Sequence, residues 1–365
     1  MPATSATSTT PSSPTTPPAS TITIVGAGMM GSALVFPAAE NGHNVRLVGT
    51  HLDRDIIDTC RATNRHPKFK KDFPATGVTY HQIDEVDTAI SGADLLICGV
   101  SSFGVDWFAG HMLPRIPENL PILSVTKGLI EDGAGGLISY PEYWKRRAAP
   151  RSPRINAVGG PCTSYELVAQ DQTVVTFCGD DLETLRFLRR LMQRPYYHIA
   201  LSTDVMGVES SVAIKNAYAM GVTLTLGINE KINGIGAPPH YNSQAGAFGQ
   251  AVAEMQKLLR LLAGNDNELA VGVGDLYVTV FGGRNRLLGT LLGRGLTLDA
   301  ALRELSGITL ESIVIIERIL KTFRLWKDKG LVDPRDYPLL SHLGEVLLDA
   351  HPVQIPWPSF VAEPP

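Results

Sequence analysis

The chain has 365 residues, of which 44% are hydrophobic and 19% are charged, and its formal net charge is −4. This composition supplies enough apolar surface for a globular protein of two domains. It argues against a nucleic-acid partner, which requires a clustered basic surface, and favours a small molecule. The sequence contains no uninterrupted apolar run of about 18 residues, so we expect no membrane insertion.

The first segment of the chain, residues 1–20, is rich in Ser, Thr, Pro and Ala and contains no charged side chain. It lacks the basic start and apolar middle of a secretory signal and the arginines of a transit peptide. We therefore expect a disordered tail. The four cysteines are too few and too irregularly spaced for a disulfide scaffold or a zinc site, so we expect a cytoplasmic protein without a metal.

A β-α-β unit is expected from Thr21, where the sequence reads TITIVGAGMMGSALVFPAAENGHNVRLVGT. Its β-branched runs predict strands and its Ala- and Leu-rich centre predicts a helix, in which Pro37 should cause a kink. Further strand-like runs occupy residues 93–101, 120–128, 155–158 and 173–179. Strands that alternate with helices favour an α/β fold with a parallel sheet covered on both faces. We assign residues 21–202 to a dinucleotide-binding Rossmann domain.

After about Ser202 the sequence becomes a series of long Ala-, Leu- and Gly-rich segments with few strand signals. We assign residues 203–350 to a helical domain that carries substrate and catalytic groups, and residues 351–365 to a C-terminal tail. The segment NEKINGIGAPPHYN contains glycines and paired prolines, and residues 229–239 of it form an insertion. This composition predicts a loop or a poorly packed insertion between two helices.

A glycine turn follows the first predicted strand and precedes the first predicted helix. Gly26, Gly28 and Gly31 match the G-x-G-x-x-G pattern in the setting that this pattern requires. Gly26 permits a tight turn, Gly28 lets the backbone approach a pyrophosphate, and Gly31 allows close packing of helix on strand. The pattern predicts a dinucleotide site, although glycine turns in other proteins serve packing alone.

The tip of the second predicted strand bears on the choice of cofactor. NAD-specific proteins place an acidic residue there, about 20 residues after the glycines, to bind the ribose hydroxyls. This strand ends in Gly49, Thr50 and His51, with Asp53 and Arg54 slightly beyond. No carboxylate stands directly at the tip to repel a 2′-phosphate, and Thr50, His51 or Arg54 could accept one. The sequence leaves NAD and NADP both open.

Two lysines match the needs of ketone reduction by hydride, which requires a proton donor and positive charge beside the carbonyl carbon. Lys127 follows a predicted strand, at the sheet edge where ligands bind. Lys215 lies in the apolar helical segment VAIKNAYAM. If both face one site, each lowers the pKa of the other, and burial lowers it further. The structural alternatives are a surface loop lysine at 127 and a solvent-facing lysine at 215.

A short glycine-bounded segment further along contains Asp275, Thr279, Arg284 and Asn285. Arg284 could form paired hydrogen bonds to phosphate oxygens, and Thr279 and Asn285 add neutral donors. Asp275 could orient a lysine ammonium group. The alternative is a structural salt-bridge turn without a ligand.

These motifs together resemble the NAD(P)-dependent glycerol-3-phosphate dehydrogenase family from about Thr21 to Pro338. The matching blocks are VGAGMMGSAL, SVTKGL, GGPCTSYELVA, DVMGVESSVAIKNAYAM and GVGDLYVTVFGGRNRLLGTLLGRG. The resemblance implies hydride transfer that interconverts dihydroxyacetone phosphate and sn-glycerol 3-phosphate, with NAD or NADP as cofactor. It implies a small phosphorylated substrate as partner, and the chain is compatible with a homodimer.

The resemblance also implies roles for single residues. Lys215 is the implied catalytic acid/base, with Lys127 and Asp275 as further catalytic residues. Together with the residues argued above, the expected cofactor contacts are Gly26, Gly28, Met29, Met30, Gly31, Thr50, His51, Lys127, Ser164, Arg284 and Glu311. The expected substrate contacts are Lys127, Gly160, Cys162, Lys215, Asn216, Asp275, Thr279, Arg284 and Asn285.

Some positions depart from the family pattern. Cys162 replaces a usual serine, Ser164 a usual small residue, Met30 an aromatic residue and Gln250 an arginine, while residues 240–242 replace a Gly-Asp-Asn segment. These changes keep two alternatives open. One is the same chemistry on a larger phosphorylated keto-polyol, such as a tetrulose or pentulose phosphate. The other is a dinucleotide-binding sensor without catalysis, against which the two retained lysines argue.

Overall fold

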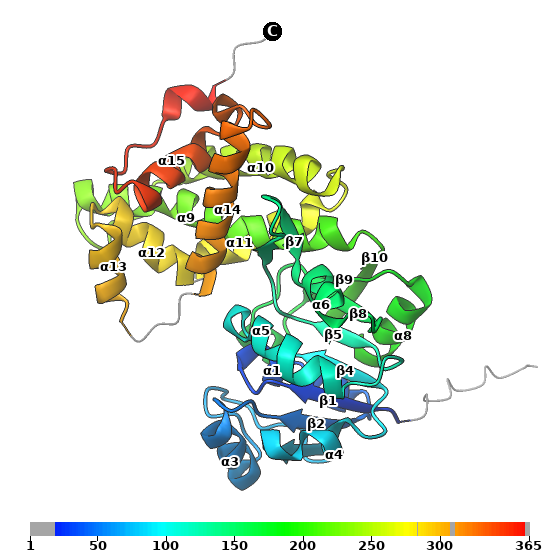
Figure 1. Cartoon of the computed structure of the whole chain (residues 1–365). Coiled ribbons are helices and arrows are strands. Elements are labelled where there is room, and N and C mark those ends of the chain that lie inside the picture. The colour runs from blue at the N-terminus through cyan, green and yellow to red at the C-terminus, as the bar shows by residue number, and fades with distance from the viewer. Residues whose placement is uncertain (1–18, 283, 307–310, 362–365) are drawn as a thin grey trace, which may run out of the picture.

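The computed structural model describes residues 19–282, 284–306 and 311–361, without the side chains of residues 284, 311 and 312. In this part of the chain, a sheet with flanking helices is followed by a helical unit, and Figure 1 shows the two as separate lobes in contact. This arrangement confirms the Rossmann-type sheet followed by helices that the sequence predicts. Most of the predicted N-terminal tail, residues 1–18, lies outside the described residues.

The first unit is built on an eight-stranded sheet with the order β10-β9-β8-β5-β4-β1-β2-β3. Its strands are β1 (Thr21–Val25), β2 (Asn44–Val48), β3 (Val78–His81), β4 (Leu95–Cys98), β5 (Ile122–Ser124), β8 (Ile155–Gly159), β9 (Thr173–Cys178) and β10 (Tyr197–Ser202). From β1 the chain adds β2 and β3 on one side of the sheet, and it then returns to add β4 and β5 on the other side. The carboxyl ends of β1, β4 and β5 therefore open onto the crevice where open α/β sheets bind ligands.

One strand pair departs from the wholly parallel sheet that we predicted. β8 and β9 are antiparallel, whereas every other neighbouring pair in this sheet is parallel. The connection between them contains only the five-residue helix α7 (Ser164–Val168). That helix rises about 7 Å, whereas a parallel crossover must retrace the roughly 16 Å of a five-residue strand. The short connection therefore returns the chain in the opposite direction.

Short helices cover both faces of the sheet (Figure 1). They are α1 (Met29–Ala33), α2 (Val35–Glu40), α3 (Arg54–Thr63), α4 (Val86–Ile90), α5 (Val105–Trp107), α6 (Tyr140–Ala148) and α8 (Leu182–Met192), together with α7. The first helical stretch breaks at Leu34, between α1 and α2. Pro37 has no N–H to donate to the carbonyl of Ala33, so the helix is interrupted there, which confirms the predicted kink.

The second unit consists of α9 (Val205–Asn233), α10 (Tyr241–Ala263), α11 (Leu269–Gly282), α12 (Arg284–Gly293), α13 (Leu298–Glu304), α14 (Glu311–Asp328) and α15 (Pro338–Leu348). The 29-residue helix α9 is buried along most of its length. Its Ala, Val, Leu and Gly residues are apolar all round, and such a helix is stable only when neighbouring helices cover every side. Helices α10, α11, α12, α14 and α15 all pack on it.

Glycines let α12 lie directly against α9. A Cβ added at Gly227 of α9 would overlap the carbonyl of Thr290, and one at Gly289 of α12 would overlap Thr223 of α9. Gly293 meets the backbone of α9 in the same way. The two helix backbones are therefore in direct contact, which brings the start of α12 close to the middle of α9.

A hairpin of the first unit packs against the helical unit. Strands β6 (Leu129–Glu131) and β7 (Leu137–Ser139) form an antiparallel pair that reaches α14. The indole N–H of Trp326 on α14 donates to the carbonyl of Gly135 at 3.1 Å, and Arg318 forms an ion pair with Glu131 at 3.3 Å. These contacts fix α14 relative to the sheet.

A buried carboxylate organises the far end of the helical unit. Both oxygens of Glu254 accept backbone N–H groups at the start of α15, from Leu339 at 2.7 Å and Leu340 at 2.9 Å. The hydroxyl of Tyr218 and the amide of Gln250 donate to the same carboxylate. Glu254 thus satisfies N–H groups that helix geometry leaves without partners.

The predicted insertion and residues 351–361 of the predicted C-terminal tail both make contacts that their composition did not suggest. Helix α9 continues to Asn233, so only the following residues form the loop, and Asn229 donates to the carbonyl of Pro238 at 2.9 Å. In the segment after α15, Ile355 is buried in the apolar core of the helical unit. Among the described residues, the helices are not both long and apolar enough for any of them to cross a membrane.

Candidate active site

The two lysines singled out in the sequence meet at one carboxylate. Lys127 Nζ donates to Asp275 Oδ2 at 2.5 Å and to the carbonyl of Gly160 at 2.8 Å. Lys215 Nζ donates to Asp275 Oδ1 at 2.7 Å and to Thr279 Oγ1 at 2.7 Å. Lys127 follows β5, Lys215 lies on α9, and Asp275 and Thr279 lie on α11. Three separate elements therefore build this cluster at the carboxyl edge of the sheet.

Burial and charge shift the pKa values within the cluster. The side chain of Asp275 is only 3% exposed and that of Lys215 10%, whereas that of Lys127 is 24% exposed. Burial lowers the pKa of Lys215, and Lys127 lowers it further, although Asp275 acts in the opposite direction. Burial alone would raise the pKa of Asp275, but the two lysines outweigh it and hold that pKa below its usual value. The carboxylate is thus ionised while the Lys215 ammonium releases its proton more readily than in water.

Two amide side chains lie next to Lys215. Asn216 follows Lys215 on α9, and its Oδ1 accepts a hydrogen bond from Asn285 Nδ2 of α12 at 3.0 Å. Both amides are buried.

Two further predicted substrate contacts are Gly160 and Cys162. Gly160, whose carbonyl accepts the hydrogen bond from Lys127, has a φ of +114°, a conformation suited to glycine. Burial raises the pKa of the half-buried Cys162 thiol to about 12, so this thiol stays neutral.

Two predicted contacts, the side chains of Arg284 and Glu311, lie outside the described residues. The backbone of Arg284 begins α12, directly before Asn285, and that of Glu311 begins α14. The helix that carries Arg284 therefore starts beside the amide pair.

The glycine turn has the shape that a dinucleotide requires. A Cβ at Gly26 would lie 2.7 Å from the carbonyl carbon of Gly99, and one at Gly31 would overlap the carbonyl of Gly26. Gly26 has a φ of +108°. By contrast, a Cβ at Gly28 would meet no atom nearer than the Gly99 carbonyl oxygen at 3.9 Å. Two glycines are needed for backbone packing, and the third leaves room for a ligand.

The remaining predicted cofactor residues lie around this turn. Met29 and Met30 begin α1 and pack against the core of the sheet unit. Ser164 begins α7, which packs against α1. Thr50 and His51 follow β2, but Thr50 is buried and its hydroxyl donates to Asp53, whereas His51 is exposed.

Some residues at the site were not predicted. Glu209 on α9 is fully buried, and neither of its carboxyl oxygens has a hydrogen-bond partner among the described residues. Burial raises its pKa to about 8, with Lys127 acting in the opposite direction. The signal was present in the sequence, because a carboxylate in an apolar helix is as unexpected as Lys215. His66, whose Nε2 lies 3.1 Å from the carbonyl of Ala27 in the glycine turn, had no such signal.

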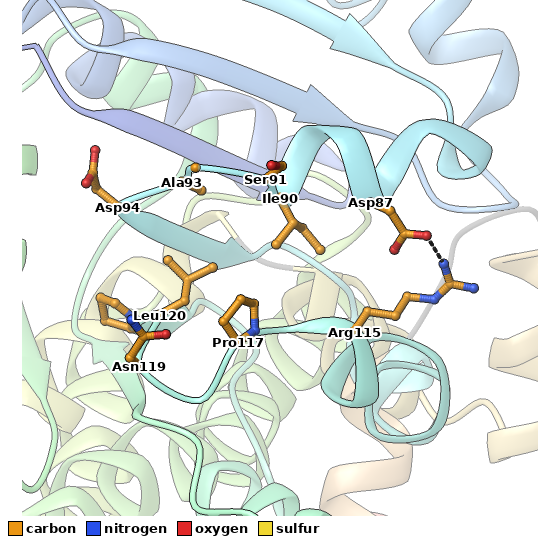
Figure 2. Close-up of a pocket in the computed structure, with 11 residues that line it drawn as sticks. Asp87, Ile90, Ser91, Ala93, Asp94, Arg115, Pro117, Asn119 and Leu120 are labelled. Atoms are coloured by element: carbon orange, nitrogen blue, oxygen red, sulfur yellow. Dashed lines mark hydrogen bonds and ion pairs between the residues drawn. The ribbon is translucent and has the colours of Figure 1, made fainter.

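A surface hollow of about 540 Å³ lies elsewhere, and Figure 2 shows residues that line it. Asp94 and Pro121 line it directly before β4 and β5, and Arg115 faces Asp87 across it at 2.8 Å. The hollow therefore lies at the amino ends of these strands, whereas Lys127 follows the carboxyl end of β5. Ligands of open α/β sheets bind at the carboxyl ends, so this hollow is separate from the lysine cluster.

Fold and site define a Rossmann-type dehydrogenase that uses a nicotinamide dinucleotide. The described residues contain no group of three or more His, Cys, Asp or Glu placed to hold a metal ion. Residues 21–184 match the model of the NAD-dependent glycerol-3-phosphate dehydrogenase N-terminus, and residues 204–356 match that of its C-terminus. The chain belongs to the NAD(P)-dependent glycerol-3-phosphate dehydrogenase family.

Individual relatives agree with this assignment. The chain is 31% identical to the NADP(+)-dependent glycerol-3-phosphate dehydrogenase of Archaeoglobus fulgidus over 287 residues, which cover 78% of this chain and 83% of that protein. It is 29% identical to the glycerol-3-phosphate dehydrogenase [NAD(P)+] of Koribacter versatilis, over 81% and 85% of the two chains. The fold is shared with the glycerol-3-phosphate dehydrogenase of Coxiella burnetii, with a TM-score of 0.75 and 21% identity over 94% and 98% of the two chains.

Proposed function

We propose that this protein interconverts dihydroxyacetone phosphate and sn-glycerol 3-phosphate by hydride transfer with NAD or NADP. The observation that carries the proposal is the convergence of Lys127 and Lys215 on the buried carboxylate of Asp275. This cluster supplies the proton donor and the positive charge that ketone reduction requires, next to a glycine turn suited to the cofactor.

The glycine turn fits a dinucleotide because the open side of Gly28 leaves room for a pyrophosphate. When bound, the nicotinamide cofactor supplies or accepts the hydride. We propose that it is held by Gly26, Gly28, Met29, Met30, Gly31, Thr50, His51, Ser164, Lys127, Arg284 and Glu311.

Lys215 is the proposed general acid for reduction. An ammonium group has three N–H donors, and among the described residues two of those on Lys215 are accounted for by Asp275 and Thr279. The third is left for the carbonyl oxygen of the substrate, to which Nζ gives its proton as the alkoxide develops. In the oxidation direction, the neutral amine removes the proton of the substrate hydroxyl. The lowered pKa of Lys215 favours both steps near neutral pH.

Lys127 is proposed to hold the substrate from the other side. Two of its N–H groups bond to Asp275 and Gly160, which leaves the third for a ligand oxygen. Asp275 orients both ammonium groups and prevents their mutual repulsion from separating them. Further proposed substrate contacts are Gly160, Cys162, Asn216, Thr279, Arg284 and Asn285.

We further propose a homodimer in the cytoplasm. The four cysteines are unpaired, which suits a reducing compartment. On α11, the exposed rings of Tyr277 and Phe281 lie 4.8 Å apart and form an apolar surface that a second copy could cover. Light scattering of the purified protein tests the dimer, and fractionation of the source cells tests the location.

A steady-state assay of the purified chain tests the reaction. Dihydroxyacetone phosphate and sn-glycerol 3-phosphate are each offered with the NAD and NADP forms, and Lys215→Met is the matched variant. We expect turnover by the wild type and a loss of at least about a hundredfold in the variant. Absence of turnover in both directions with both cofactors overturns the proposal. Turnover of tetrulose or pentulose phosphates in place of the three-carbon compound reassigns the substrate.

A further inference from the structure

The carboxylate of Asp53 lies at the tip of β2, although Asp53 comes five residues after the strand ends at Val48. A tight turn folds it back. The backbone N–H of Asp53 donates to the carbonyl of Thr50 at 3.1 Å, and both the N–H and the hydroxyl of Thr50 donate to Asp53 Oδ2 at 2.8 Å. Gly49 permits this, because a Cβ there would lie 2.6 Å from Ile57 Cγ1 and 3.2 Å from the Cβ of Asp53.

The same carboxylate contacts the glycine turn. The N–H of Ala27 donates to Asp53 Oδ2 at 3.2 Å, while His66 Nε2 lies 3.1 Å from the carbonyl of Ala27. His66 Nδ1 accepts the N–H of Lys68, so Nε2 carries the proton and donates to that carbonyl. Asp53 and His66 therefore hold the Ala27 residue from its two sides, between Gly26 and Gly28.

The two oxygens of Asp53 differ in their contacts. Oδ2 accepts three hydrogen bonds, from Ala27 and twice from Thr50, whereas Oδ1 accepts none from the residues that the structure describes. Asp53 is half-buried, so its side chain is not fully enclosed by the protein. A carboxylate oxygen held at this point is an acceptor for two neighbouring hydroxyl groups and repels a phosphate.

Two arginines on the helix that follows this turn are paired with other carboxylates. Arg54 Nη2 pairs with Asp84 at 2.9 Å, and Arg61 pairs with Glu85. His51 is exposed and lies against the ring of Trp107, with the ring centroids 5.8 Å apart.

We propose that Asp53 binds the hydroxyl groups of the adenosine ribose and that this protein prefers NAD(H) to NADP(H). The inference rests on the proposed function only in that the ligand is a nicotinamide dinucleotide. It replaces the expectation that the strand tip lacks a carboxylate. It also separates this chain from its Archaeoglobus fulgidus relative, which is named NADP-dependent.

Binding of reduced cofactors to the full chain tests the proposal without any substrate. Titration of NADH and of NADPH, followed by cofactor fluorescence, yields a Kd for each. We expect the wild type to bind NADH at least about tenfold more tightly, the usual size of a hydrogen bond to a charged group. In Asp53→Asn, the amide oxygen can replace Oδ2 in the turn while the charge is removed, so we expect the NADPH/NADH Kd ratio to fall at least about tenfold.

Asp58→Asn is the matched control. Asp58 lies on α3 and accepts only Gln82 Nε2 in the described part of the chain, so this change alters net charge equally but away from the glycine turn. We expect its Kd ratio to stay within about twofold of the wild type. Tighter binding of NADPH by the wild type overturns the proposal without any variant, as does an unchanged ratio in folded Asp53→Asn. Normal cofactor binding with no turnover would instead overturn only the proposed reaction.

Discussion

Replacing Asp275 by Asn removes the negative charge that the ammonium groups of Lys127 and Lys215 share and keeps the shape of the side chain. Two unit charges about 4 Å apart interact by about 4 kcal/mol at an effective dielectric constant of about 20. This attraction favours the charged form of Lys215, whose Nζ lies 2.7 Å from Asp275 Oδ1. Water that enters the site of the variant replaces part of it. We expect the pKa of Lys215 to fall, because burial and Lys127 already lower it and Asp275 opposes them.

The pH dependence of kcat/KM measures this shift. Reduction requires protonated Lys215, so activity is lost as the pH rises through its pKa. In Asp275→Asn this loss should begin at a lower pH, and the reduction rate above the wild-type pKa should fall about a hundredfold. For oxidation, which requires the neutral amine, the rise in activity with pH should move down by the same interval.

Thr279→Val is the control for this experiment. Thr279 also accepts a hydrogen bond from Lys215, at 2.7 Å, but carries no charge. Its replacement should lower the rate while moving the pH profile by less than about half a unit, because no unit charge is removed. A profile of Asp275→Asn that keeps the wild-type pH dependence at a reduced rate would refute the electrostatic argument. Asp275 would then only position the lysines.

Three further changes test other parts of the structure. Lys127→Met should raise KM for the phosphorylated substrate by about tenfold or more in the steady-state assay, because it removes a charged ligand contact; an unchanged KM would exclude that contact. Burial raises the pKa of Glu209 to about 8, so the stability that its protonation contributes is complete below about pH 4.5 and lost as the pH rises to about 8. Glu209→Gln should therefore raise the free energy of unfolding by about 4 to 5 kcal/mol at pH 8 but not at pH 4.5, as measured by denaturant titration, and equal effects at both pH values would contradict this. Burial likewise raises the pKa of Glu254 to about 6, so its protonation stabilises the fold below about pH 4.5 and this contribution disappears by about pH 6. Between these values the wild type should lose about 2 kcal/mol relative to Glu254→Gln, and parallel stability curves would be inconsistent with the shift.

Sequence patterns predicted the parts of this protein that depend on local chemistry. The glycines at 26, 28 and 31 indicated the turn and its position between strand and helix, because other residues do not tolerate the close backbone contacts at 26 and 31 or leave the open space at 28. Lys215 stood out as a charge in an apolar helix, and Pro37 marked the helix break. In each case the residue type by itself restricts the backbone conformation or the burial of the side chain. The prediction therefore needs no knowledge of contacts with distant segments.

Features that depend on how distant segments meet were not predictable in this way. The spacing of Asp53 from β2 suggested a position beyond the strand tip, and only the turn with Thr50 returns its carboxylate there. The antiparallel direction of β9 depends on the short connection from β8, and the length of the helix in that connection cannot be read from composition. Ile355 lies in a Pro-rich terminal segment that reads as a tail, yet it is buried against the helical core.

The contact between α9 and α12 changes how natural variants of this protein should be interpreted. Gly289 is four residues beyond Asn285, and neither it nor Gly227 belongs to the expected ligand contacts. A methyl group at either position would push the two helix axes apart, and Asn285 would lose its reach to Asn216. Such a substitution should lower both the stability of the helical unit and the affinity for substrate. A variant catalogue should therefore group these glycines with the ligand-binding residues as well as with the core.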